Sequence, residues 1–233
     1  MPGYIIHLCA AKELLKLLMD HDLLTTEKEQ NEFFVSSLIP DAVKDKAISH
    51  YRHTNDPMIK VRYPLPWRFA ERYPHLMHTP QGIGYLFHLY TDYLFYHEYF
   101  YRHILFTDEN DGLQVSEDKI RLAYLVDYDR TIPSSDLFSD GYLYDDYTTF
   151  HGMLEEIYGF DHDLKPADNP GFKEVDYNNL SQIIRDLELY SELGKSFKYR
   201  ETTVLKKEPL LAFIKQTAPR FLFDYPFVLE DHS

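Results

Sequence analysis

Histidine and carboxylate residues at helical spacing are the residues of this chain best suited to bind a metal ion or to transfer protons. The segment 82–101, GIGYLFHLYTDYLFYHEYFY, is nearly all aromatic or aliphatic, yet it carries His88 and Asp92. If it is a helix, residues four apart lie on one face about one turn from each other, so the imidazole and the carboxylate point the same way. Burying two such groups is costly unless they are paired, hydrogen-bonded or bound to an ion. The pair therefore predicts either a structural His–Asp contact or a metal site.

Further ligand-type residues stand in apolar helical settings elsewhere, namely His7, Asp41, His50 and the i,i+4 pair His151 and Glu155. Neutral imidazole and carboxylate oxygen are ligands of zinc and similar divalent ions. Helices that present such groups to a shared interior can build a site for several ions, with bridging carboxylates and a bound water as nucleophile. Each residue also has a structural explanation: a helix-start histidine bonded to backbone for His7, an N-cap for Asp41, a helix end for His50 and a surface pair for the last two.

His97 is another imidazole in the same apolar segment, but a regular helix places it badly. It lies nine residues after His88, so it points about 180° away at roughly 100° per residue. His97 joins the site only if the helix breaks near Phe95.

Helices are the elements expected to position these residues. The apolar spacing predicts a helix over 4–20, which carries His7 in its first turns. Asp41 is the expected N-cap of a helix that presents His50 and His53 on one face.

The second half of the chain is also predicted to be mainly helical. A helix is expected over 144–158, a short helix or strand over 119–129, and amphipathic helices over 178–190 and 208–216. Together these patterns predict an all-α protein, with residues 1–233 forming a single domain built as a multi-helix array with long loops.

Composition narrows the function. A formal net charge of -14 argues against nucleic acid as the main partner and against electrostatic docking on anionic membranes. One cysteine, Cys9, excludes an internal disulfide framework and a thiolate zinc cluster. The sequence contains no run of 18 apolar residues and no signal-peptide pattern, so we expect a cytoplasmic protein without a membrane span. The oligomeric state is left open.

The ordered set of motifs resembles the zinc-dependent phospholipase C family and its nuclease relatives of the same all-helical fold. The order is a histidine near the N-terminus, a Pro-Asp turn followed by a histidine, His-x-x-x-Asp in an apolar helix, and His-x-x-x-Glu. The segments MPGYIIHLCAAK, LIPDAVKDKAISHYR, GYLFHLYTDYLFY and YDDYTTFHGML are most similar to the short, signal-less bacterial members, described as phospholipase C-like. The resemblance spans about residues 1–158 and implies a phospholipase C/P1 nuclease-like array, with 159–233 as a C-terminal helical extension.

The resemblance implies a role for each candidate residue. Asp41 and Asp92 are the catalytic candidates, Asp41 as a ligand and general base and Asp92 as a ligand that bridges ions. Asp146 is implied as a ligand or as a partner of one, and His53 as the substitute for His50. One to three ions are expected, zinc (Zn2+) or alternatively Mn2+, Fe2+ or Ni2+. The full set of implied metal ligands is His7, Asp41, His50, His88, Asp92, Asp146, His151 and Glu155.

The function expected from this set is metal-dependent hydrolysis of a phosphate ester, in a small molecule or a lipid, by a metal-bound hydroxide. Two other functions are compatible with the residues. One is a non-catalytic helical binding protein with structural His/Asp pairs or one ion. The other is an HD-type phosphohydrolase, which needs a His-Asp doublet; the sequence has two, His21-Asp22 and His162-Asp163, both in expected loops or helix ends. The motif Asp127-x-Asp129-x-Thr131 has the form used by haloacid dehalogenase-like phosphatases, but those enzymes need a doubly wound sheet that the following sequence does not predict.

Overall fold

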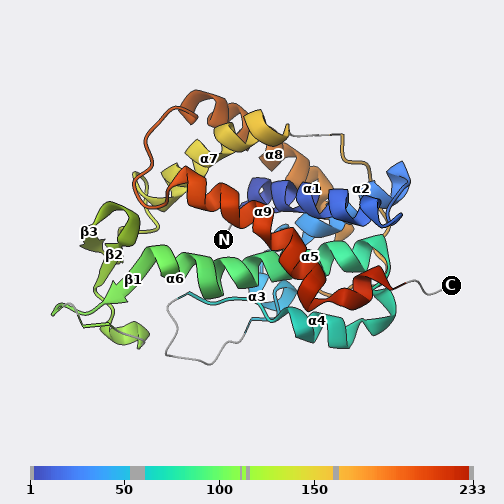
Figure 1. The fold of residues 1–233 in the computed structure, drawn as a ribbon, viewed down its shortest axis with the longest axis horizontal. Coiled ribbons are helices and arrows are strands. Elements are labelled where there is room, and N and C mark those ends of the chain that lie inside the picture. Colours follow the sequence, from blue (N-terminus) through green and yellow to red (C-terminus); the bar gives the residue numbers. More distant parts are fainter. Residues whose placement is uncertain (1–2, 53–60, 111, 114–115, 160–162, 231–233) are drawn as a thin grey trace.

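The computed structural model describes residues 3–52, 61–110, 112–113, 116–159 and 163–230 (Figure 1). Most of this part of the chain is helical, so the prediction of a mainly helical protein is confirmed. A small antiparallel sheet, which the sequence did not predict as such, lies at one end of the helical body (Figure 1). No helix in the described ranges is both long enough and apolar enough to cross a membrane.

Helix α5, Pro80–Leu94, is the centre of the molecule. Every residue from Gly82 to Asp92 is buried, as expected for a helix that is apolar all round. Thr79 starts the helix because its side chain accepts a hydrogen bond from the Gly82 amide at 3.1 Å, and Pro80 occupies the first turn, where its missing N–H costs nothing.

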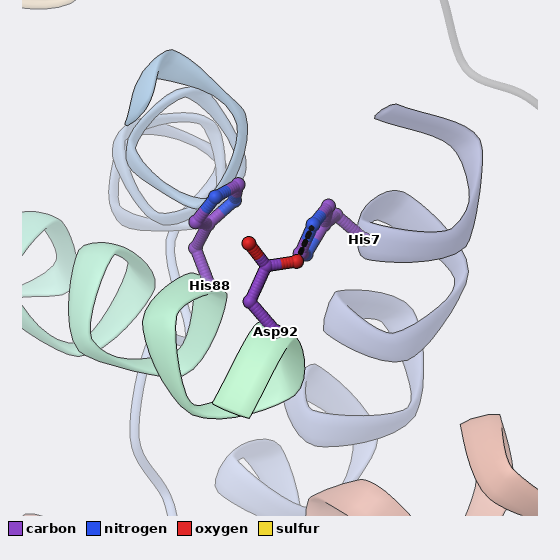
Figure 2. A group of neighbouring side chains, drawn as sticks. All are labelled: His7, His88 and Asp92. Atoms are coloured by element: carbon purple, nitrogen blue, oxygen red, sulfur yellow. Dashed lines mark ion pairs between the residues drawn. The ribbon is translucent and has the colours of Figure 1, made fainter. Parts of the chain in front are cut away.

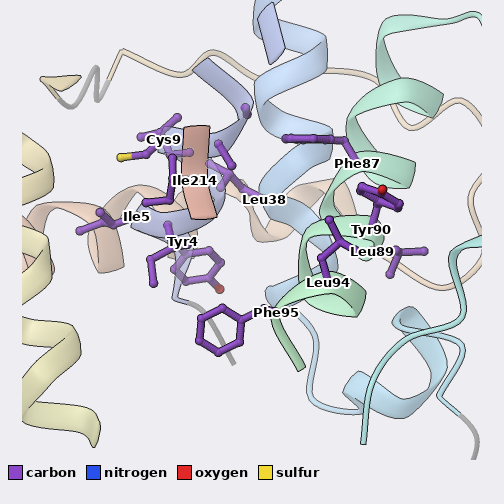
Figure 3. Packing of buried hydrophobic residues seen from close by; sticks show 14 of the residues in the cluster. Tyr4, Ile5, Cys9, Leu38, Phe87, Leu89, Tyr90, Leu94, Phe95 and Ile214 are labelled. Atoms are coloured by element: carbon purple, nitrogen blue, oxygen red, sulfur yellow. The ribbon is translucent and has the colours of Figure 1, made fainter. Parts of the chain in front are cut away.

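Helices α1 (Tyr4–Asp20) and α2 (Glu27–Leu38) pack beside α5. The start of α2 is a capping box between Thr26 and Glu29. Contact between α2 and α5 depends on Gly84, because a Cβ at this position would lie 2.4 Å from the carbonyl oxygen of Phe33. Helix α1 also contacts the C-terminal helix α9, Lys207–Asp224, where Ile5 and Cys9 meet the apolar layer that contains Ile214 (Figure 3).

The segment between α2 and α5 corrects one expectation. Asp41 does not cap a helix; it ends a 3₁₀ turn, Ile39–Asp41, that continues from α2. The next helix, α3, is only Lys46–Ser49, and its cap is Asp45, whose Oδ1 accepts from the Ala47 amide at 3.0 Å. The short α4, Pro66–Arg72, follows, and His53 lies outside the described residues.

After α5 the chain changes from α-helical to π-helical geometry. Phe95–Tyr99 forms a π-helical stretch, and α6, Phe100–His103, completes the rod. The wider turn changes the phase of the side chains that follow, which is the usual effect of a π-bulge. The chain then enters β1 (Ile104–Thr107).

The sheet contains β1, β2 (Leu122–Leu125) and β3 (Arg130–Pro133) in the order β1-β2-β3. Its register sets Phe106 opposite Ala123 and Ala123 opposite Ile132, so one face of the sheet is apolar and buried. For residues 119–129 the sequence predicted either a short helix or a strand. The structure has a strand there, β2.

Helices α7 (Leu143–Tyr158) and α8 (Leu180–Phe197) pack closely against each other. Two glycines permit this, because a Cβ on Gly152 would lie 2.2 Å from the Gly194 carbonyl oxygen, and one on Gly194 would lie 2.6 Å from the Gly152 amide nitrogen. The last helix, α9, extends well beyond the expected 208–216 and contains Pro219 in its interior.

Candidate metal centre

Five of the predicted ligands converge on one buried point. His7 comes from the first turns of α1, Asp41 from the 3₁₀ turn, His50 from the end of α3, and His88 and Asp92 from α5. None of the five is more than 7% exposed. Figure 2 shows that His88 and Asp92 project from consecutive turns of α5 and that Asp92 reaches His7 on α1. We call these five residues the His/Asp cluster.

The distances in the cluster are short and place Asp92 between two histidines. Its Oδ1 is 3.2 Å from His7 Nε2 and its Oδ2 is 3.3 Å from His50 Nε2. His50 Nε2 is also 3.4 Å from Asp41 Oδ1 and 3.1 Å from His88 Nε2. Ligand-type atoms lie within 4.8 Å of one another in two overlapping sets, one formed by His7, His88 and Asp92 and the other by Asp41, His50 and His88.

These separations match those expected between the ligands of one ion. With zinc–ligand bonds of about 2.0–2.1 Å in tetrahedral geometry, ligand atoms lie about 3.3 Å apart. The contacts of His50 Nε2 with Asp41, His88 and Asp92 run from 3.1 to 3.4 Å. Each of the two sets combines two imidazoles with one carboxylate, a donor set that zinc-class ions accept.

Hydrogen bonds on the far sides of the rings fix which nitrogens face the cluster. His88 Nδ1 lies 2.9 Å from the carbonyl oxygen of Ser37, which only accepts, so Nδ1 carries the proton. Ser49 Oγ donates its proton to the Pro40 carbonyl at 2.8 Å, so it accepts from His50 Nδ1 at 2.8 Å. Both Nε2 atoms therefore present lone pairs to the cluster, the arrangement that outer hydrogen bonds give to histidine ligands.

The charged state of the cluster suits a cation. Burial alone would raise the pKa of Asp92, but contacts with His50 and His7 outweigh it and hold the pKa well below its usual range. Burial is likewise outweighed at Asp41, whose pKa is lowered by His50, His88 and Lys46. Burial and the neighbouring His7 ring, stacked on His88 at 3.9 Å, lower the pKa of His88 well below its usual value. Ionised carboxylates and neutral imidazole are the forms that bind metal ions.

The cluster also contains buried polar atoms that lack hydrogen-bond partners in the described part of the chain. These are both ring nitrogens of His7, both carboxylate oxygens of Asp92, and Asp41 Oδ1. The Asp92 carboxylate has ion-pair contacts with His7 and His50 at 3.2 and 3.3 Å to offset the cost of burying its charge, and a further partner is expected. A divalent ion among these atoms would remove that cost, and the residues present therefore fit one.

The remaining three predicted ligands are not brought into this cluster. His151, on α7, is 5% exposed, has no hydrogen-bond partner for either ring nitrogen within the described ranges, and lines an adjoining cavity; burial lowers its pKa to about 4. Glu155 points toward α8, where its Oε1 accepts from Ser191 Oγ at 2.7 Å. Asp146 accepts from the amides of Thr203 and Val204 at 2.7 Å and from that of Leu205 at 2.9 Å.

Asp146 thus ties the segment before α9 to α7, and its expected role as a ligand or as a partner of one stays a prediction. His97 is likewise outside the site. The helix does depart from α-geometry at Phe95, but the π-helical stretch leaves His97 exposed and stacked on Tyr93 at 4.9 Å, while Tyr96 turns inward.

Two residues near the cluster were not predicted. Lys46 Nζ lies 2.8 Å from Asp41 Oδ1, and Tyr147, 6% exposed, carries a buried hydroxyl without a partner in the described structure. The sequence held a signal for each, because Lys46 follows Asp41 by five residues and Tyr147 precedes His151 by one helical turn. Both line a cavity of about 490 Å³ that opens beside Asp41 and reaches His151.

The residues of the other two hydrolase motifs lie in unsuitable places. His21 and Asp22 are exposed at the end of α1, about 21 Å along the helix axis from His7 at 1.5 Å per residue. Asp127 and Asp129 lie at the turn between β2 and β3 of an antiparallel sheet, where Asp127 Oδ2 pairs with His103 Nδ1 at 2.7 Å. Neither position provides the environment that the corresponding enzyme class needs. The other His-Asp doublet, His162-Asp163, lies partly outside the described residues, because His162 is not among them.

Comparison with known proteins gives no match to a family model, a curated protein or a solved structure.

Proposed function

We propose that this chain is a metal-dependent hydrolase of a phosphate ester, with a ligand arrangement and fold of the phospholipase C-like kind. The observation that supports this most strongly is the position of the Asp92 carboxylate, between His7 and His50 and without a hydrogen bond of its own in the described chain. A carboxylate in that position is suited to bridge neighbouring ions.

The ion would be held by the His/Asp cluster, with Asp41, His50 and His88 as one set of ligands and His7, His88 and Asp92 as the other. Zinc, manganese, iron(II) and nickel all accept this donor set. When bound, such an ion lowers the pKa of a water molecule and neutralises charge that develops on phosphoryl oxygens.

Asp41 and Lys46 are the groups of this chain that connect the cluster to the adjoining cavity. Asp41 is a carboxylate that lies both in the cluster and on the cavity wall, so it is placed to take the proton that an attacking water loses. Lys46, with a side chain 37% exposed, keeps an ammonium group next to Asp41 and can pair with a phosphate oxygen. The buried hydroxyl of Tyr147 can donate a hydrogen bond in the same cavity.

The cavity favours hydrolysis over a purely structural metal site. Structural zinc sites are closed by protein ligands, whereas catalytic ones remain open on one side. Here Asp41 lies both in the cluster and on the cavity wall, so a small substrate has a route to the ligands.

The test combines metal analysis with a substrate screen. Protein purified without a histidine tag should contain at least one transition-metal ion per chain, and it should hydrolyse chromogenic phosphomonoesters or phosphodiesters with added zinc or manganese. Asp41→Asn should retain fold and lose hydrolysis. Metal-replete protein that hydrolyses none of these esters would favour the alternative, a non-catalytic helical metal-binding protein.

A further inference from the structure

The cavity beside the His/Asp cluster has a wall of tyrosines that the proposed hydrolysis does not itself require. Four positions of α7 share the face that lines it at i, i+3, i+4 and i+7, and tyrosines from α1 and α8 complete the wall. The side chains from these three helices are Tyr144, Tyr147, Thr148, His151, Tyr4 and Tyr190.

The shape of the cavity suits a small organic group. Its volume of about 490 Å³ falls within the usual range of small-molecule sites, roughly 300–1,000 Å³. Aromatic rings bind best to other rings in offset or edge-on contact, and tyrosine gives a large, rigid contact area with a polar end. His151 and Tyr190 are already in tilted contact at 5.2 Å between ring centroids, so the wall presents ring surfaces on adjoining helices.

Two buried polar groups on the wall have no partner in the described structure. The Tyr147 hydroxyl and both ring nitrogens of His151 lack hydrogen bonds, although these residues are only 6% and 5% exposed. Leaving such groups unsatisfied is costly, which indicates that the cavity is built to receive a ligand with polar atoms.

The charged side chains that line the cavity indicate whether its ligand is an anion or a cation. Lys46 is the cation on this wall, and Asp41, the carboxylate there, is already paired with it at 2.8 Å. Burial keeps the hydroxyls of Tyr4 and Tyr147 protonated by raising the pKa of each. The Lys46 side chain is 37% exposed, so its ammonium group can also pair with an anionic head, whereas a quaternary ammonium group would find no unpaired carboxylate on the described part of this wall.

We propose that the cavity binds the organic part of an aryl phosphate ester, with Tyr4, Tyr144 and Tyr190 as specificity-determining residues and the phosphate held at Lys46 and the cluster. This inference rests on the proposed function, because the cluster must hold an ion to attract the phosphate. It adds to that function a substrate class: small phosphate esters whose alcohol component is a planar ring.

Non-hydrolysable phosphonates separate the two claims, because their affinity does not depend on leaving-group chemistry. Calorimetric titration of the zinc-loaded protein should show phenylphosphonate binding about tenfold more tightly than methylphosphonate, equivalent to about 1.4 kcal/mol. Tyr144→Ala and Tyr190→Leu should each reduce this ratio to about threefold or less. Both positions tolerate change, because Tyr144 is 52% exposed and Tyr190 is only partly buried. Tyr199→Ala, at a position 81% exposed and absent from the cavity wall, is the matched control and should keep the full ratio.

Each contrary result has a separate meaning. Equal affinity for the two phosphonates would overturn the aryl specificity and leave the proposed hydrolase intact. Tighter binding of phosphocholine than of phenylphosphonate would overturn it in favour of a cationic head group. Failure of the zinc-loaded protein to bind either phosphonate would overturn the proposed phosphate chemistry itself, and the inference with it.

Discussion

The Nε2 atoms of His50 and His88 face each other across 3.1 Å, each with its proton committed to the opposite side of its ring. Two lone pairs at this distance repel unless a cation or a proton lies between them. Contacts with Asp41 and Asp92 raise the pKa of His50 against the effect of its burial, so the ion-free cluster favours a proton on this ring. An entering metal ion displaces it, which couples metal binding to proton release.

The first prediction concerns Asp92. Asp92→Asn keeps the size of the side chain but removes the charge that lies between His7 and His50, so metal content measured by mass spectrometry should fall to less than a tenth of the wild-type value. The fold should persist, with an unchanged far-ultraviolet circular dichroism spectrum. Asp145→Asn is the control, because this carboxylate is partly exposed, lies outside the cluster and pairs with Arg200 at 2.7 Å. Full metal content in Asp92→Asn would show that the Asp92 carboxylate on α5 is not needed to bind the metal ion.

A second prediction concerns Ser49, which touches the cluster only through His50. Ser49→Ala removes the acceptor for the Nδ1 proton, so the ring loses its fixed tautomer and the affinity for zinc should fall about 10- to 100-fold. Competition with a chelator of known affinity measures this change. Ser135→Ala, at an exposed serine bonded to Asp136, should leave the affinity unchanged. If Ser49→Ala bound zinc as tightly as the wild type, His50 would not be a ligand held by this bond.

The third prediction concerns the pH dependence of stability and rests on His151. Burial lowers its pKa from 6.5 to about 4, so the folded chain binds fewer protons than the unfolded chain between these values. Its contribution to the free energy of unfolding is therefore fully present above pH 6.5 and is lost as the pH falls toward 4, by up to about 3 kcal/mol. Urea titrations of metal-free His151→Gln should show a correspondingly weaker loss over this interval.

The comparison for this pH effect is His75→Gln, because His75 is exposed in the segment before α5. Its pH profile should follow that of the wild type. Identical slopes for wild type and His151→Gln would mean that the imidazole titrates normally and is not buried in the neutral form.

A fourth prediction separates Asp146 from the metal ligands. Asp146→Ala leaves the buried amides of Val204 and Leu205 without their acceptor, so the free energy of unfolding should fall by about 2–4 kcal/mol. Zinc content should not change. Chemical denaturation and metal analysis of the same preparation measure both effects. Loss of metal from a variant that remains folded would return Asp146 to the set of ligands.

The local sequence determined most of the long helices and the residues that form the His/Asp cluster. The bounds of α1 agree with its apolar spacing, and the spacing of His88 and Asp92 was enough to place both on one face of a buried helix, because helical geometry is a local property. The capping box of Thr26 and Glu29 at the start of α2 is local in the same way, since it involves only neighbours in the chain.

Tertiary structure decided which of the candidate residues meet. The tautomers of His50 and His88 depend on Ser49, Pro40 and Ser37, whose proximity follows from the path of the chain after α2. Asp146 and His151 share one helix and similar sequence surroundings, yet one anchors the segment before α9 and the other lines a cavity. Spacing along a helix gives a side chain its direction, but only the packing of distant helices determines what lies in that direction.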